Sequence, residues 1–141
     1  MICVFFGHSD APMSAKEKVK SAILLLLNEG CKCFYVGNNG SFDILVQAVL
    51  KEIESDRGEL NYKIVLSRVG EKAKSGEQER TVLPEGQELF LPKFAITKRN
   101  DWMVKKATVL VVYLLNSCSR IAKYVDSAKK KGIRVINLAE E

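Results

Sequence analysis

Five short runs of apolar, β-branched and aromatic residues set the strongest limit on the fold of this chain. Most of these runs are apolar at every position instead of alternating with polar residues. Such runs are expected in a parallel sheet whose two faces are both covered by helices. The predicted strands are Ile2 to Phe6, Cys33 to Val36, Tyr62 to Leu66, Thr108 to Tyr113 and Ile133 to Leu138.

Segments with helical periodicity separate the predicted strands. The first, Ser14 to Asn28, begins with a serine and has Glu17 three residues later, which predicts a capping box. The other predicted helices are Phe42 to Ser55, Lys93 to Lys106 and Ser119 to Lys131. The alternation predicts an α/β fold, a three-layer Rossmann-like, doubly wound parallel sheet of about five strands.

The expected strand order, 3-2-1-4-5, locates a ligand site. Ligands in this architecture bind beyond the carboxyl ends of the strands, where the strand order reverses. The reversal falls between the first and fourth strands, so the loops Gly7 to Pro12 and Leu114 to Ser119 face it. The turn Gly37 to Asp43 lies alongside.

Length and composition are those of a single globular domain over residues 1–141, with 47% hydrophobic and 28% charged residues. The longest strictly apolar run, Ala22 to Leu27, is far shorter than the roughly 20 residues that cross a bilayer. The first six residues lack a basic leader, so we expect a cytoplasmic protein without a membrane segment. Four cysteines and one histidine fit no common zinc pattern, so we expect reduced thiols, no metal site and no cofactor.

The net charge of +5 permits nucleic-acid binding but does not require it. The run Lys129 to Lys131 precedes Gly132, where cations complement the negative end of a helix. A nucleic-acid surface would also show interleaved aromatic residues or a known motif, and we find neither. Nucleic acid is therefore not the expected partner.

The turn from Gly37 to Asp43 is the best indication of function. A strand that feeds a helix through such a turn presents unpaired backbone N–H groups and the positive end of the helix dipole, which suit a phosphate. In this interpretation Gly37 and Gly40 allow close approach, and side chains contact a phosphate or ribose. The predicted contacts are Asn38, Asn39, Ser41 and Asp43. Alternatively, the turn is only a tight connection in which Ser41 or Asp43 caps the helix.

Three further groups of candidate ligand contacts follow strands or lie on a predicted helix. His8 follows Gly7 and either organises its loop or contacts the ligand. Arg99 is either an exposed charge or a bidentate phosphate clamp, with Asn100 beside it. A polar run before the last helix offers either an ordinary N-cap or a second anion site. Its candidate residues are Asn116, Ser117, Ser119 and Arg120.

The segment Arg68 to Pro92 is rich in Glu, Lys and Gly and contains Pro84. A connection of this length without regular structure is typical of lids or disordered segments. We expect a flexible flap over the ligand cleft at residues 68–92.

Four ordered blocks resemble the SLOG superfamily, the Rossmann-like group that joins the DNA-processing protein A domain to the Lonely guy phosphoribohydrolases. The blocks are Cys3 to Asp10, Phe34 to Asp43, Pro92 to Val104 and Ala128 to Leu138. The chain looks most similar to the small stand-alone bacterial branch related to YpsA. The resemblance implies binding of a nucleotide or nucleotide-derived ligand, by an enzyme or by a sensor.

The chain departs from the pattern of that superfamily in two places. Asn38 and Ser41 stand where glycines are usual, and Ser119 and Arg120 replace a glycine pair. The glutamate of the phosphoribohydrolase motif has no counterpart between Asn116 and Lys123.

These features favour a nucleotide-binding sensor or degenerate family member. One alternative is an enzyme that cleaves the N-glycosidic bond of a nucleoside 5'-monophosphate, with Asp43 or Asp10 as its carboxylate. A second is single-stranded DNA binding, which would weaken steeply with salt. Apolar helix faces and Trp102 suggest a homodimer.

Overall fold

A single sheet of six parallel strands forms the centre of the computed structural model, which describes residues 1–8, 11–115 and 119–140. The strands are β1 (Ile2–Gly7), β2 (Cys33–Val36), β3 (Tyr62–Val65), β4 (Thr81–Val82), β5 (Val109–Tyr113) and β6 (Arg134–Asn137). Their spatial order is β4-β3-β2-β1-β5-β6. The α-helices are α1 (Lys16–Asn28), α2 (Gly40–Arg57), α3 (Pro92–Lys106) and α4 (Ala122–Lys130).

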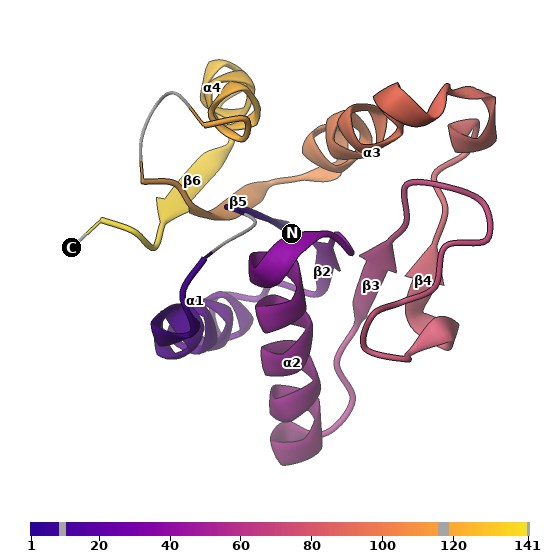
Figure 1. Cartoon of the computed structure of the whole chain (residues 1–141). Helices are drawn as coiled ribbons and strands as arrows, with labels where there is room; N and C mark the ends of the chain where they lie inside the picture. The colour runs from indigo at the N-terminus through magenta and orange to yellow at the C-terminus, as the bar shows by residue number, and fades with distance from the viewer. Residues whose placement is uncertain (9–10, 116–118, 141) are drawn as a thin grey trace.

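The helices form a layer on each face of the sheet, with α1 and α2 on one side and α3 and α4 on the other (Figure 1). Successive side chains of β1 point to opposite faces. Cys3 and Phe5 therefore pack in the core with α1 and α2, whereas Val4 and Phe6 pack in the core with α3 and α4. Burial on both faces explains why the strand sequences are apolar at consecutive positions.

The predicted fold class and strand order are confirmed. Each of the five predicted strands forms within a residue or two of its expected bounds, and β1 pairs with both β2 and β5. The order reverses between β1 and β5, as expected. The structure adds β4, a two-residue strand paired with β3 at the edge of the sheet, which is too short to produce a hydropathy signal.

The predicted capping box of the first helix is wrong. A 3-10 turn, η1 (Met13–Ala15), precedes α1, and the N-cap residue Ala15 has helical backbone angles and makes no side-chain cap bond. Because η1 continues directly into α1, Ser14 lies inside a turn and cannot take the extended conformation that a capping serine needs.

The segment from Arg68 to Pro92 contains short ordered elements that pack beside β3. These are η2 (Gln78–Arg80), β4 and η3 (Gln87–Leu89). The Arg80 guanidinium lies 3.8 Å from the centre of the Tyr62 ring and forms ion pairs with Glu54 and Glu77. Arg80 thus attaches the segment to β3 through Tyr62 and to α2 through Glu54.

Over the described part of the chain, no helix is both long enough and apolar enough to span a membrane. The same residues contain no cluster of three or more His, Cys, Asp or Glu side chains that could hold a metal ion.

Candidate functional site

A cavity of about 880 Å³ opens beyond the carboxyl ends of β1 and β2, at the reversal of strand order. Residues from β1, from the turn before α2, from α3 and from the start of α4 line it. The lining residues are Phe5, Phe6, Gly7, His8, Gly37, Asn39, Gly40, Asp43, Pro92, Lys93, Ile96, Thr97, Arg99, Asn100, Met103, Ser119, Arg120, Ile121, Lys123 and Tyr124. The volume lies within the range of about 300–1,000 Å³ that is usual for small-molecule sites.

The turn between β2 and α2 needs its two glycines for different reasons. Gly40 has a φ of +81°, a backbone conformation that side chains disfavour. Gly37 is needed for space, because a Cβ there would lie 2.7 Å from Asp43 Oδ2 and 3.1 Å from Arg99 Nη1. Asp43 and Arg99 therefore both border the space that a side chain at Gly37 would fill.

Arg99 is 3% exposed, so its interpretation as an exposed solvated charge is wrong. Its Nε donates to Asn100 Oδ1 at 2.9 Å, and Nη1 donates to Asn39 Oδ1 at 3.0 Å and to the Val65 carbonyl at 3.1 Å. Within the described residues, Nη2 makes no hydrogen bond and no carboxylate oxygen lies within 4.0 Å of the guanidinium. Burial lowers the pKa of Arg99, while the charges of Asp43 and Glu71 oppose that shift.

Asp43 lies in the first turn of α2 and is also buried, with an exposure of 8%. Its Oδ2 accepts a hydrogen bond from the backbone N–H of Asn39 at 2.9 Å, the N-cap position of α2. Burial raises its pKa to about 6, against the opposing effects of Arg99 and of the Asn39 N–H. The carboxyl group therefore changes charge within the range where a proton-transfer group is useful.

His8 organises the two loops at the reversal point. Its Nε2 accepts a hydrogen bond from the backbone N–H of Leu115 at 2.9 Å, which joins the loops that follow β1 and β5. The ring also lies edge-on to Tyr113, with 6.4 Å between centroids. His8 lines the cavity as well, so both interpretations of this residue are compatible with its place.

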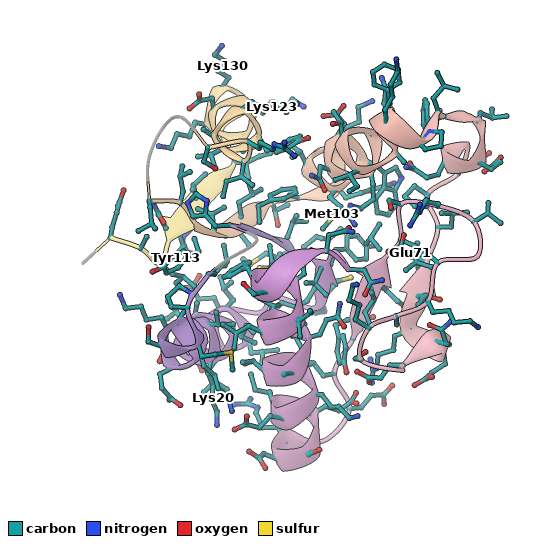
Figure 2. The ribbon with its side chains drawn as sticks, in the orientation of Figure 1. Lys20, Glu71, Met103, Tyr113, Lys123 and Lys130 are labelled. Carbon is teal, nitrogen blue, oxygen red and sulfur yellow. The ribbon has the colours of Figure 1, made fainter. Side chains whose placement is uncertain are left out.

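Exposed cations and an aromatic wall complete the cavity. Lys93, Arg120 and Lys123 lie at its exposed margin. Phe6 and Tyr124 stack with their centroids 5.3 Å apart and form an apolar wall. Figure 2 labels Met103 on α3 and Lys123 on α4, both of which line the cavity. Among the described lining residues, Asp43 is the only carboxylate and four side chains are cationic.

Most of the predicted site residues lie together in this cavity. They are Gly7, His8, Gly37, Asn39, Gly40, Asp43, Arg99, Asn100, Ser119 and Arg120. Asn38 and Ser41 do not line it: Asn38 is 1% exposed and bonds to residues 71–74, and Ser41 Oγ donates to the Ala11 carbonyl. The predicted contacts Asn116 and Ser117, and the alternative carboxylate Asp10, lie outside the described residues.

Ser119 is not the N-cap of α4, because the N-cap residue is Ile121 and it makes no side-chain cap bond. Its hydroxyl accepts a hydrogen bond from the Ile121 N–H at 3.1 Å in the turn that leads into α4. Serine side chains often accept a nearby backbone N–H in this way within turns. Its neighbour Arg120 is exposed at the cavity.

Sequence reasoning missed the aromatic wall and two of the cations. Phe6 belongs to an apolar strand run, and Tyr124 and Lys123 lie inside a predicted helix where no local motif marks them as ligand contacts. Lys93 lies just after a proline at the start of α3, where nothing local distinguishes it from a solvated lysine. Only the placement of α3 and α4 on the same face of the sheet brings these residues to one cavity.

Comparison with known proteins adds no relative: no protein-family model matches the chain, and no match is found among curated proteins.

Proposed function

We propose that the chain binds a nucleotide or nucleotide-derived ligand in this cavity, as a sensor or a binding protein. The observation that carries the proposal is Arg99. The Arg99 guanidinium is buried, and among the described residues no carboxylate lies within 4.0 Å of it and none forms a hydrogen bond with its Nη2. The group has therefore lost hydration without gaining an ionic partner. A phosphate oxygen would supply that partner, and guanidinium nitrogens bind phosphate strongly.

The rest of the lining supports a ligand with an anionic part and a flat apolar part. The start of α2 adds its positive dipole end next to Arg99. The stacked pair of Phe6 and Tyr124 offers an apolar surface for a base. Lys93, Arg120 and Lys123 attract an anion to the opening.

Isothermal titration tests this proposal with a panel of nucleoside mono- and diphosphates, cyclic nucleotides and ADP-ribose. We expect at least one phosphorylated compound to bind, and Arg99→Ala to weaken that binding by roughly 100-fold, the loss of one charge-assisted contact. Arg99→Lys keeps the charge and should retain part of the affinity.

The matched control for Arg99 is Lys98→Ala, one residue earlier on α3. Lys98 is exposed and lies over the Phe90 ring, outside the cavity lining. It should leave affinity within about twofold of the unmodified chain. Absence of binding at millimolar ligand, or equal losses in both variants, contradicts the proposal.

A second candidate function is hydrolysis of the N-glycosidic bond of a nucleoside 5'-monophosphate. Asp43 favours it, because a buried carboxyl group with a pKa of about 6 faces the same cavity as the anion-binding arginine. Release of free base, lost in Asp43→Asn, would support this activity. Release no faster than in a heat-inactivated control excludes it.

A further inference from the structure

Glu71 lies in the segment that follows β3 and joins this segment to the ligand turn. Its Oε1 accepts hydrogen bonds from the Ser67 N–H and hydroxyl, both at 2.9 Å, and from the Arg68 N–H at 3.3 Å. Its Oε2 accepts from Asn38 Nδ2 at 2.8 Å. Although burial opposes ionisation, the hydrogen bonds hold the pKa of Glu71 below its ordinary value. The carboxylate therefore stays charged.

Asn38 is buried, does not line the cavity, and fixes the turn through its side chain. Its Nδ2 also donates to the Lys72 carbonyl at 2.8 Å, and its Oδ1 accepts from the Lys74 N–H at 2.9 Å. Gln47 of α2 donates to both Asn38 Oδ1 and the Gly37 carbonyl. The Asn38 side chain thus stays out of the cavity lining and fastens the turn to residues 71–74.

The position of this turn determines where Arg99 points. Asn39, the residue after Asn38, accepts the Nη1 hydrogen bond of Arg99 and donates its backbone N–H to Asp43. A displacement of Asn38 would move both contacts. Glu71 also acts through its charge, which raises the pKa of Asp43 and of Arg99.

We propose that Glu71 is a positioning residue of the anion site. Through Asn38 it holds the turn that orients Arg99, and its carboxylate adds negative charge to the buried pair of Asp43 and Arg99. Its link to ligand binding rests on the proposed function. Figure 2 labels Glu71 on the segment after β3, outside the cavity lining, so it acts without touching the ligand.

The first test needs no ligand. The charged groups that act on Asp43 are Arg99 from α3 and Glu71 from the segment after β3, together with the Asn39 N–H. In an NMR titration of the Asp43 carboxyl carbon, Glu71→Gln should shift the midpoint, because it removes a negative charge and releases the turn whose Asn39 N–H contacts Asp43. A role confined to the segment after β3 would not move this midpoint.

The matched control is Glu77→Gln in the same segment. Glu77 accepts from the Tyr62 hydroxyl at 2.8 Å and pairs with Arg80, so it stabilises the segment without contacting the turn. It should leave the Asp43 midpoint unchanged. Equal midpoints in Glu71→Gln, Glu77→Gln and the unmodified chain overturn the proposal.

The second test measures binding of adenosine 5'-monophosphate by titration calorimetry. Asn38→Ala should weaken binding about tenfold by releasing the turn, whereas Glu77→Gln should stay within about twofold. If Asn38→Ala keeps its affinity and its far-UV circular dichroism spectrum shows that it is folded, the positioning role is overturned. If the unmodified chain binds no phosphorylated compound, the proposed function fails, and the Asp43 titration still decides the role of Glu71.

Discussion

At the residue scale, the site contains two buried charged groups that lie close to one glycine. Arg99 and Asp43 are both at least nine-tenths buried, and the Gly37 backbone lies against both. The sequence indicated Gly37 and Asp43 by their position after a strand and Arg99 by its type on a predicted helix. It could not indicate their burial or their partners, because Arg99 reaches Asn39 from 60 residues away. Contacts over that distance arise only from the packing of α3 on the sheet.

Asp43→Asn tests how much the buried carboxyl group of Asp43 lowers the free energy of unfolding. Its pKa rises from an ordinary 3.8 to about 6, so between these values the folded chain holds a proton that the unfolded chain has released. Stability is therefore lost as the pH rises through this window, by about 3 kcal/mol in full. We expect Asp43→Asn to gain stability relative to the unmodified chain by about 2–3 kcal/mol between pH 4 and pH 7.

Urea unfolding at pH 4.5 and pH 7.5 measures this difference for both proteins. A stability difference that is the same at both values contradicts the shifted ionisation of Asp43. The linkage argument requires the difference to grow toward neutral pH and then level off.

Gly37→Ala tests the close packing of the turn. The added Cβ would meet Asp43 Oδ2 at 2.7 Å and the Arg99 guanidinium at 3.1 Å, so one or both charged groups must move. Overpacking of this kind destabilises a protein by about 1–3 kcal/mol. We expect that loss in urea unfolding, together with weaker binding of any phosphorylated ligand. Unchanged stability would show that the turn has room to relax.

At the element scale, the local sequence pattern predicts the long helices and strands but not the short elements. The four α-helices and five of the strands have a run or a period that is visible along the chain. In contrast, β4 has two residues, and its existence depends on pairing with Ile64 and Val65 of β3. The structure of residues 68–92 could not be predicted because contacts with β3 and α2 supply the order that the local sequence lacks.

Arg80→Ala tests how that segment is held. The arginine stacks on Tyr62, pairs with Glu54 and Glu77, and donates to the Leu60 carbonyl at 3.1 Å. Its loss should destabilise the chain by about 1–3 kcal/mol, because buried acceptors lose their donor. We also expect faster proteolysis within residues 68–80, measured by mass spectrometry of the fragments. Cleavage rates equal to those of the unmodified chain would show that other contacts hold the segment.

At the scale of the whole molecule, the sheet order explains the place of the site. The cavity lies at the reversal of strand order, where β2 pairs with one edge of β1 and β5 pairs with the other. The loops that follow these strands diverge there and leave space between the two helix layers. The sequence predicted this crevice once the strand order was assumed. It did not predict that α3 would add Lys93, or that α4 would add Lys123 and Tyr124, to the same cavity.

The same order predicts a gradient of local stability. Pairing on both sides and burial of nearly every side chain should give β1 the slowest amide exchange in the molecule. The amides of β4, at the edge and half-buried, should exchange faster. Hydrogen exchange followed by NMR measures both. Exchange in β4 as slow as in β1 would contradict this gradient.

The short outer strands also affect how copies of the chain meet. An outer strand with unpaired backbone groups is a template on which another chain can add a strand, and brevity and charge reduce that hazard. Here β4 offers two residues, while β6 begins with Arg134, which is exposed and paired with Glu29. Each outer strand therefore presents little backbone to a neighbour, and we expect the folded chain to resist growth into cross-β aggregates even at high concentration.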